Sequence, residues 1–217
     1  RRTVLAGIRG RPAREPRHVG RAGRKYSRAF RCERRLSAVG VLDDILARIA
    51  ACDEVTPVIT HEAAGLCDAF QAERLTLFKV SADRNALEAV LQTGLEDLRV
   101  IRLPLDEKHT VAGYAGRLAK LVNVRDAYDK AALEAFDPPL AFLAQVDERT
   151  GFRTREILAA PVVGADAALL GVVQFVNRRD HQPFPPACEM ALTALCGALA
   201  GALSREGPAH VVRQAAL

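Results

Sequence analysis

The first apolar residues at helical spacing begin near residue 42. They are Leu42, Ile45, Leu46 and Ile49. Residues three and four apart share one face of a helix, so this spacing predicts an amphipathic helix. A second helix is expected over residues 57–70, because proline is favourable in the first turn of a helix.

The period then changes to the alternation that is typical of strands. Residues 74–80 read RLTLFKV, and the Asp-Arg-Asn sequence at 83–85 predicts a hairpin turn. Further strands are expected at residues 86–91, 98–103, 121–124, 157–163 and 169–177. Among them, residues 110–119 predict a short helix with Thr110 as its N-cap, and residues 126–136 predict another that ends before Pro138.

A long helix is expected from about Pro186 to about Ser204. Its apolar stripe consists of Leu192, Leu195, Leu199 and Leu203. Such a stripe can face the sheet of its own chain or a second copy of the chain, and the first helix leaves the same two alternatives open. Helices around one set of strands predict an α+β fold with an antiparallel sheet flanked by helices.

Charge divides the chain of 217 residues into unlike parts. Residues 1–38 hold 13 Lys and Arg against two acids, a net charge of +11, whereas the remainder holds 18 bases and 24 acids, a net charge of −6. The first part lacks apolar periodicity, which predicts a disordered basic arm at 1–38, a globular domain at 39–205 and a flexible tail at 206–217. The arm either contacts nucleic acid or anionic lipid through its arginines or is an unstructured leader.

The sequence contains neither a run of 18 apolar residues nor an apolar stretch after the basic start, so we expect no spanning segment and no secretory signal. Its five cysteines are odd in number and form no C-x-x-C pair. This pattern favours a reducing compartment, and we expect a cytoplasmic protein.

Motifs for catalysis are absent from the sequence. None of the five histidines lies in a G-x-S-x-G or H-E-x-x-H motif, no phosphate-binding loop occurs, and His and Cys do not pair at metal-ligand spacing. We therefore expect no enzymatic activity, no metal and no cofactor.

A polar segment follows the central helices. Residues 146–157 read VDERTGFRTREI, in which Thr150 and Thr154 are four apart and follow Asp147. On one helical turn this spacing places both hydroxyls on the same side, and with the carboxylate they suit a small polar ligand. The alternative interpretation is a surface turn.

Three segments in order then point to a family: residues 123–128 (NVRDAY), 146–155 (VDERTGFRTR) and 171–178 (GVVQFVNR). They resemble the GAF domains of cyclic-nucleotide phosphodiesterases and bacterial cyclases, over about residues 42–203. The resemblance implies a GAF/PAS-like six-stranded antiparallel sheet with helices on both sides. It also implies a pocket for a small molecule, often cAMP or cGMP, and a homodimer formed through the terminal helices.

The resemblance assigns ligand-binding positions. Thr150 and Thr154 match pocket threonines, and Asp147 matches an acidic pocket residue. Val111 and Ala112 match the start of the helix whose backbone meets the phosphate, which agrees with the attraction of helix N-terminal amides for anions.

The resemblance assigns further ligand-binding positions, several of them on strands. Thr76 and Gln174 match strand residues that face the pocket. Leu91 and Gln92 stand where cGMP-binding members carry an aromatic–Asp pair, and Leu143 replaces a pocket aromatic. The phosphate and ribose side is therefore expected to be retained and the base side altered.

A clamp at the side of the pocket is implied by the family's Asn-Lys…Asp-Glu signature. It appears as Asn177 and Arg178 followed by Cys188 and Glu189, and we expect Arg178 to reach Glu189 in place of the family's Lys–Asp pair.

We expect a non-enzymatic sensor domain that binds a cyclic nucleotide or another small anion and acts on an output protein or a missing output domain. The alternative is a ligand-free dimerisation or docking module of a signalling or secretion-ATPase assembly. Covalent bilin attachment and methionine sulfoxide reduction on this fold need pocket cysteines, and none lies between Cys67 and Cys188.

Overall fold

The computed structural model describes residues 40–94, 101–105 and 110–206, except residue 143. The chain divides into two compact units, Arg1–Ser37 and Ala38–Leu217. The first unit, which contains nearly all of the predicted basic arm, lies outside the described residues, as do residues 207–217 of the predicted tail. The description below concerns the second unit alone.

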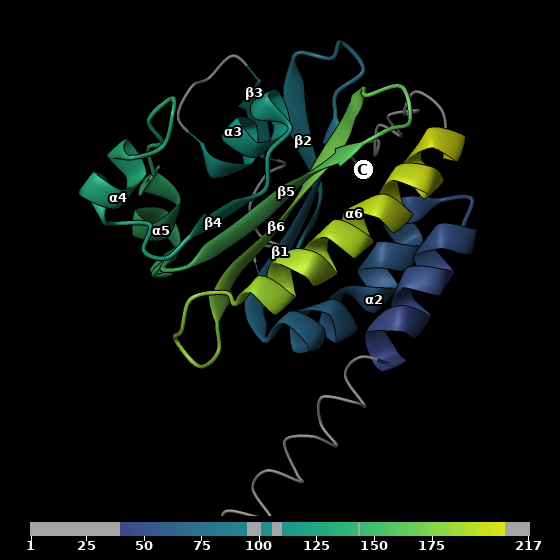
Figure 1. Cartoon of the computed structure of the whole chain (residues 1–217), viewed down its shortest axis with the longest axis horizontal. Helices are drawn as coiled ribbons and strands as arrows, with labels where there is room; N and C mark the ends of the chain where they lie inside the picture. Colours follow the sequence, from purple (N-terminus) through teal and green to yellow (C-terminus); the bar gives the residue numbers. More distant parts are fainter. Residues whose placement is uncertain (1–39, 95–100, 106–109, 143, 207–217) are drawn as a thin grey trace, which may run out of the picture. The chain divides into compact units, whose positions relative to one another are not determined.

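Six strands form one antiparallel sheet in the order β3-β2-β1-β6-β5-β4 (Figure 1). They are β1 (Ala72–Val80), β2 (Ala86–Gln92), β3 (Arg102–Pro104), β4 (Val122–Val124), β5 (Ile157–Val163) and β6 (Leu169–Arg178). The long strands β1 and β6 lie at the centre and pair from Ala72 opposite Arg178 to Lys79 opposite Gly171. The expected α+β fold with a six-stranded antiparallel sheet and flanking helices is confirmed.

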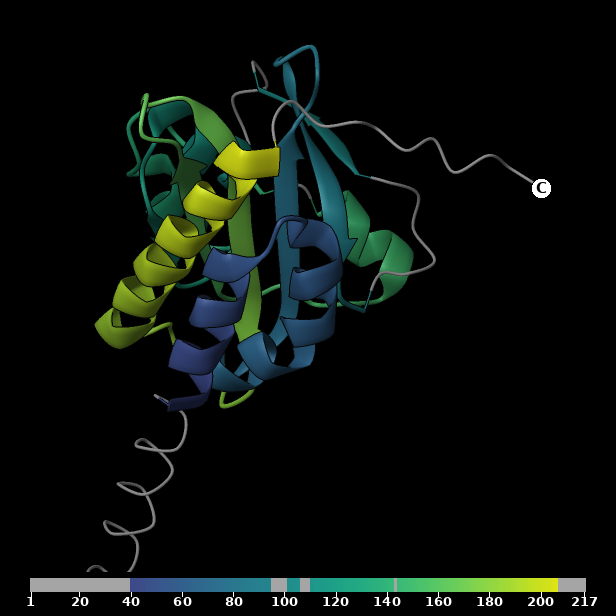
Figure 2. The ribbon, with the colours of Figure 1, turned by 90° about the vertical axis from the view of Figure 1, so that its right-hand side faces the viewer.

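One face of the sheet is covered by a helix at residues 40–51, by α2 (Val55–Phe70) and by α6 (Pro186–Glu206), as Figure 2 also shows. The predicted leucine stripe of α6 faces this sheet, since Leu192, Leu195 and Leu199 are completely buried in the core. The spacing of the leucines left open whether the stripe faces the sheet of its own chain or a second copy of the chain. In the structure α6 packs over β5 and β6, so the stripe faces its own sheet.

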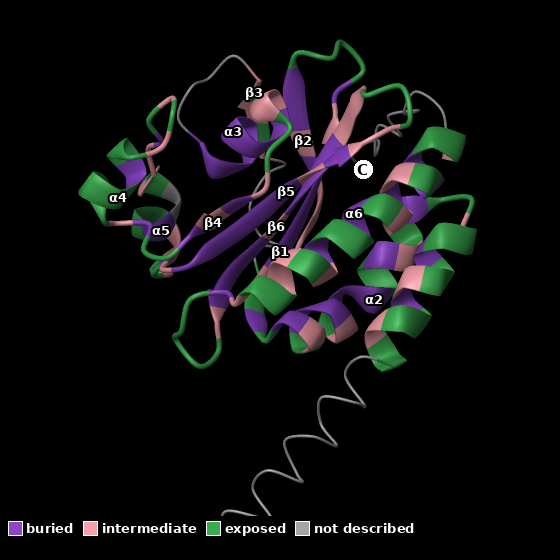
Figure 3. Cartoon of the chain, in the orientation of Figure 1, coloured by how far each residue is buried: buried purple, intermediate pink, exposed green. Residues whose placement is uncertain are grey.

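The opposite face carries α3 (Val111–Leu118), α4 (Lys130–Glu134) and α5 (Gln145–Thr150). As predicted, Thr110 caps α3, and its hydroxyl oxygen accepts from the Gly113 amide at 3.0 Å. Figure 3 shows the strands largely buried between the two helical layers, with exposed residues on the outward sides of the helices. A second apolar core therefore lies on this side, separate from the one under α6.

The helix predicted over residues 126–136 is wrong in extent, because α4 spans only Lys130–Glu134. Before it, the Ala127 amide donates to the Arg155 carbonyl at 2.7 Å and the Asp126 carboxylate accepts from the Tyr128 amide at 2.9 Å. These bonds hold the backbone beside the start of β5, outside a helix. The strand predicted at 98–103 begins at Arg102 within the described residues, and residues 98–100 lie outside them.

By length and composition, α6 is long and apolar enough to cross a membrane, contrary to the expectation from the sequence. Buried core helices meet the same criterion, and the leucine stripe of α6 is packed against the sheet. The finding is therefore weak support for a spanning segment.

Candidate functional site

A cavity of about 150 Å³ lies on the α3 and α5 side of the sheet. Six of the residues expected from the sequence line it: Thr76, Val111, Ala112, Asp147, Thr154 and Gln174. They come from β1, β6, the start of α3, α5 and the segment before β5. Residues spread over about 100 positions of the chain thus meet at one concave site.

Polar side chains of the two central strands, Thr76 on β1 and Gln174 on β6, lie on the floor of the cavity. Thr76 lies opposite Gln174 on β6 and opposite Gln92 on β2. Because directly opposed residues point to the same face, the three side chains share the cavity side of the sheet. Gln92 does not itself line the cavity, although its side-chain oxygen is buried without a hydrogen-bond partner. Leu91 packs instead against the core on the helical face of α2 and α6, so its assignment to the pocket is wrong.

The wall of the cavity is held by the carboxylate of Asp147, which is only 6% exposed. It accepts from the Thr154 amide at 2.6 Å, from the Thr154 hydroxyl at 2.8 Å and from the Tyr128 hydroxyl at 3.0 Å. Desolvation and the bond to Asp147 raise the pKa of Tyr128. Asp147 therefore connects α5 to the start of β5 and to the loop after β4; we call this set of bonds the Asp147 clasp.

Thr150 occupies a different position from the one expected. Helix α5 ends at Thr150, and Gly151 follows in the left-handed region with φ 67°. The predicted helical turn shared by Thr150 and Thr154 is therefore wrong. Thr150 accepts from the Phe152 amide at 3.3 Å and does not line the cavity, whereas Thr154 meets Asp147 through direct hydrogen bonds.

Replacing Asp147 with asparagine is expected to lower the free energy of unfolding by about 2 kcal/mol, because the new NH₂ group would face a buried donor. Urea denaturation followed by circular dichroism measures the loss. The matched control is Glu148→Gln, at the exposed neighbouring position, which should change stability by less than about 0.5 kcal/mol. Equal effects at the two positions would contradict a structural role for the clasp.

The N-terminal end of α3 also meets the cavity. The Thr110 side chain and carbonyl accept from the amides of Gly113 and Tyr114. The amides of Val111 and Ala112 precede these and have no acceptor within the helix by its geometry. Both residues line the cavity and are buried, so two helix N-terminal amides lie where an anion would be stabilised.

The predicted clamp residues lie outside the cavity and have other partners. Arg178 pairs with Asp180 at 2.8 Å, and Glu189 accepts from the amide nitrogen of Asn123 at 2.7 Å. The expected contact between Arg178 and Glu189 is therefore wrong, because each side chain is engaged by a different residue. Asn177 is completely buried and bonds to the backbone at residues 153 and 155, next to the cavity wall.

Several lining residues were missed by the sequence analysis. Arg74 lies two positions before Thr76 on β1, and its guanidinium lies 3.4 Å from the centre of the Phe152 ring. The period of two along a strand was the signal that could have placed Arg74 on the cavity face. Phe142 also lines the cavity and contacts the ring of Tyr128, with ring centres 5.0 Å apart. Leu143 lies outside the described residues.

The four described cysteines lie away from the cavity. Burial raises the pKa of all four thiols, to about 12 for Cys196. Thiol catalysis uses cysteines with a lowered pKa, which none of these four has. Within residues 40–94, 101–105 and 110–206, no group of three or more His, Cys, Asp or Glu side chains is placed to hold a metal ion.

No family model matches the chain. A curated relative, a probable 3',5'-cyclic phosphodiesterase of Caenorhabditis elegans, is 28% identical over 159 residues, which cover 68% of this chain and 20% of that protein. The chain thus spans about a fifth of the length of the curated relative that it matches.

Solved structures match over most of the chain. The GAF domain of a phosphoenolpyruvate-protein phosphotransferase from Coxiella burnetii has a TM-score of 0.62 at 17% identity, covering 78% of this chain and 94% of that one. Free methionine-R-sulfoxide reductase from Neisseria meningitidis has a TM-score of 0.60 at 18% identity, covering 80% and 92%. Identities this low concern the fold alone, and the structures that share the fold include both GAF domains and a reductase. The expected absence of enzymatic activity stays a prediction.

Proposed function

We propose that this chain, which has the fold of the GAF domains, is a sensory or regulatory domain that binds a small anionic ligand in the cavity beneath α3 and α5. Its fold was implied by the three sequence motifs and is confirmed by the six-stranded sheet and the matching GAF structures. The ligand, the signalling role and the partners belong to the proposal.

One observation carries the proposal: the same mostly apolar cavity is lined by two kinds of polar group. One kind favours an anion, and the other can hydrogen-bond to an uncharged polar part of a ligand. The amides at Val111 and Ala112 and the guanidinium of Arg74 provide positive potential. Thr76 and Gln174 provide neutral donors and acceptors on the floor. A mostly apolar pocket with a few converging polar groups is the usual form of a small-molecule site.

The size of the cavity limits what it holds without a movement of its wall. Its volume of about 150 Å³ is below the roughly 300 Å³ at which ligand pockets commonly begin. A cyclic nucleotide would therefore require an outward movement of the wall that the Asp147 clasp holds. A smaller organic anion would fit the cavity as it stands.

Two further observations favour cyclic nucleotides as the first ligands to examine. The C. elegans relative is described as a cyclic phosphodiesterase, and the match covers 68% of this chain. Val111 and Ala112, whose backbone the resemblance assigned to the phosphate, both line the cavity.

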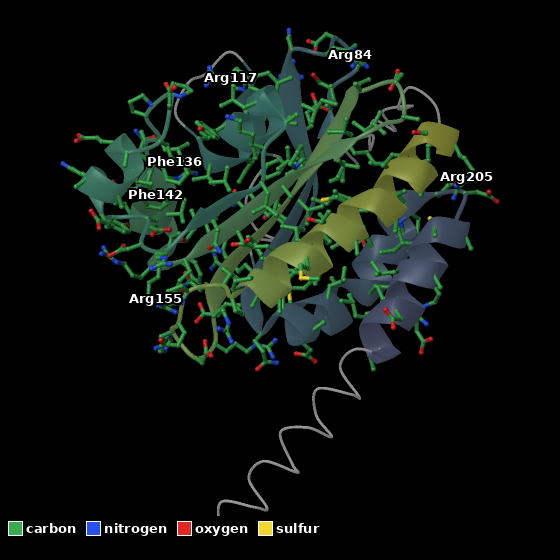
Figure 4. All side chains as sticks on the ribbon, in the orientation of Figure 1. Arg84, Arg117, Phe136, Phe142, Arg155 and Arg205 are labelled. Carbon is green, nitrogen blue, oxygen red and sulfur yellow. The ribbon has the colours of Figure 1, made fainter. Side chains whose placement is uncertain are left out.

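Isothermal titration with cAMP and cGMP tests the proposal. We expect saturable binding of at least one nucleotide. Arg74→Met should weaken it about tenfold or more, because a charge-assisted hydrogen bond is worth about 1.5–3 kcal/mol. The control Arg84→Met changes an exposed arginine of the 83–85 turn, which is labelled in Figure 4 and does not line the cavity, and should leave affinity unchanged. Absence of binding at millimolar nucleotide would exclude the nucleotide version, and equal loss in both variants would exclude recognition by Arg74.

A ligand-free dimerisation or docking module is the second candidate. The observation in its favour is the outward face of α6, where Met190 is 75% exposed and Ala194, Gly197 and Gly201 are exposed beside it. A homodimer formed through this face, or an output protein docked on it, would bury these side chains. Such a module would show no heat with either nucleotide and would keep its partner binding in the Arg74→Met variant.

A further inference from the structure

The ring of Phe152 forms part of the cavity wall. Phe152 is half-buried and follows Gly151, at which α5 ends. Its ring centre lies 3.4 Å from the guanidinium carbon of Arg74 on β1, a cation–π contact. The Arg74 side chain is itself packed against Gly94, where a Cβ atom would lie 3.3 Å from the Arg74 Nε. The Phe152 ring is therefore stacked on a side chain that has little room to withdraw.

The backbone beside Phe152 is held as well. Arg153 lies over the ring of Tyr128, with its guanidinium carbon 3.4 Å from the ring centre. Thr154 bonds to the Asp147 carboxylate through its amide and its hydroxyl. The two residues that follow Phe152 thus fasten the segment before β5 to its neighbours, and the position of the Phe152 ring follows from contacts on both sides.

The space left beside this ring is the size of one small ring. An apolar protein cavity of about 150 Å³ holds one molecule of benzene, and the cavity here has a volume of about 150 Å³. The phenyl ring of Phe152 is itself benzene-sized, so without it the cavity would reach about 300 Å³, where ligand pockets commonly begin. The other apolar side chains that line the cavity include Phe78, Leu103, Phe142, Ile157 and Val176.

We propose that Phe152 determines the size of the ligand and limits the cavity to a compact anion whose apolar part is a single ring, of the class of benzoate; this inference rests on the proposed function. The anionic group lies toward Arg74 and the first amides of α3, which favour negative charge. The ring of the ligand lies among the apolar side chains, where Phe142 and Phe152 offer aromatic contacts.

A cyclic nucleotide carries a base and a ribose in addition to its phosphate. It therefore has to displace the Phe152 ring from Arg74, and the loss of that contact opposes its binding. Phe152 thus favours the small ligand twice, by contact with its ring and by exclusion of a larger competitor.

Isothermal titration of the full chain with benzoate, cAMP and cGMP tests the role of Phe152. The wild type should bind benzoate saturably. Phe152→Ala should weaken benzoate about fivefold through loss of an aromatic contact. It should strengthen the better-bound nucleotide about fivefold, because no stacked ring has to be displaced. Shifts in opposite directions distinguish selection by size from a general disturbance of the site.

Two further variants accompany the titration. Phe152→Leu retains part of the bulk and so preserves the fold if the alanine variant does not; it should shift both affinities in the same directions by about twofold. Phe136→Ala is the matched control. Phe136 is also half-buried and is labelled in Figure 4, but it packs against Tyr114 with ring centres 5.8 Å apart and does not line the cavity. This variant should leave the ratio of the two affinities unchanged.

Each outcome decides the proposal. Parallel shifts, or no shift, in the Phe152 variants would overturn the role of Phe152, as would an equal change of the affinity ratio in Phe136→Ala. Nucleotide binding without benzoate binding in the wild type would overturn the single-ring class and leave the proposed function standing. If none of the three compounds binds to the wild type or to any variant, the proposed function fails and this inference fails with it.

Discussion

Alanine in place of Gly171 is expected to lower the free energy of unfolding by about 3 kcal/mol or more, a large part of the roughly 5–15 kcal/mol by which a typical domain is stable. A Cβ atom at this position would lie 2.3 Å from the carbonyl oxygen of Phe78. Both residues belong to the central strand pair, in which Gly171 lies opposite Lys79. Backbone on both sides is fixed by neighbouring strands, so neither strand can move aside cheaply.

Gly197→Ala is the matched control for this substitution. Gly197 lies on the exposed face of α6, and nothing lies within 4 Å of the position that its Cβ would take. Alanine there should stabilise the protein by about 0.5–1 kcal/mol, because glycine in a helix interior costs backbone entropy. Urea denaturation of both variants measures the contrast. Similar stability of the two would mean that β1 and β6 are not packed as described.

Replacing Asn177 with alanine is expected to cost about 3 kcal/mol of unfolding free energy. The side chain is completely buried; it donates to Glu73 at 2.9 Å and to the Arg153 carbonyl at 2.8 Å, and accepts from the Arg155 amide at 2.7 Å. Its φ of 53° is also a conformation that asparagine tolerates better than alanine. The substitution leaves buried backbone groups unpaired beside Thr154.

Thermal denaturation and urea denaturation measure this loss, with Asn85→Ala as control. Asn85 is exposed in the hairpin turn, where it accepts from Arg102 at 2.7 Å, and its replacement should cost less than about 0.5 kcal/mol. A loss below about 1 kcal/mol for Asn177→Ala would contradict the description of this residue as a buried connector. It would also leave open what holds residues 153–155 against β6.

The sequence predicted most regular elements because their signals are local. The leucines of α6 repeat at helical spacing, and apolar and polar residues alternate over 74–80. Each pattern therefore indicates its own type of element, a helix and a strand. The cap at Thr110 could also be predicted, since its acceptor and donor are three residues apart. The prediction of a helix over residues 126–136 failed for the opposite reason. The Ala127 amide bonds to the carbonyl of Arg155, far along the chain, so local propensity did not determine the structure of this segment.

The candidate site was predictable in part. The resemblance assigned Thr76, Gln174 and Thr154 to one pocket, and all three line the cavity. Leu91 was misplaced because it lies opposite Leu77, on the face of the sheet that packs under α2 and α6, whereas its neighbour Gln92 lies opposite Thr76. Thr150 was misplaced because the helix ends at Gly151, where the shared helical turn was assumed to continue.

By itself the sequence determined the fold class, the helical stripes, the strands and the motifs that resemble GAF domains, since each depends on residues close together in the chain. Only the tertiary structure decided that α6 faces its own sheet, that Asp147 is bonded to Thr154 and Tyr128, and that Glu206 caps α2. The physical reason is that a buried charge or unpaired amide takes whichever partner the fold brings within hydrogen-bond distance. For Glu206 that partner lies 151 positions away.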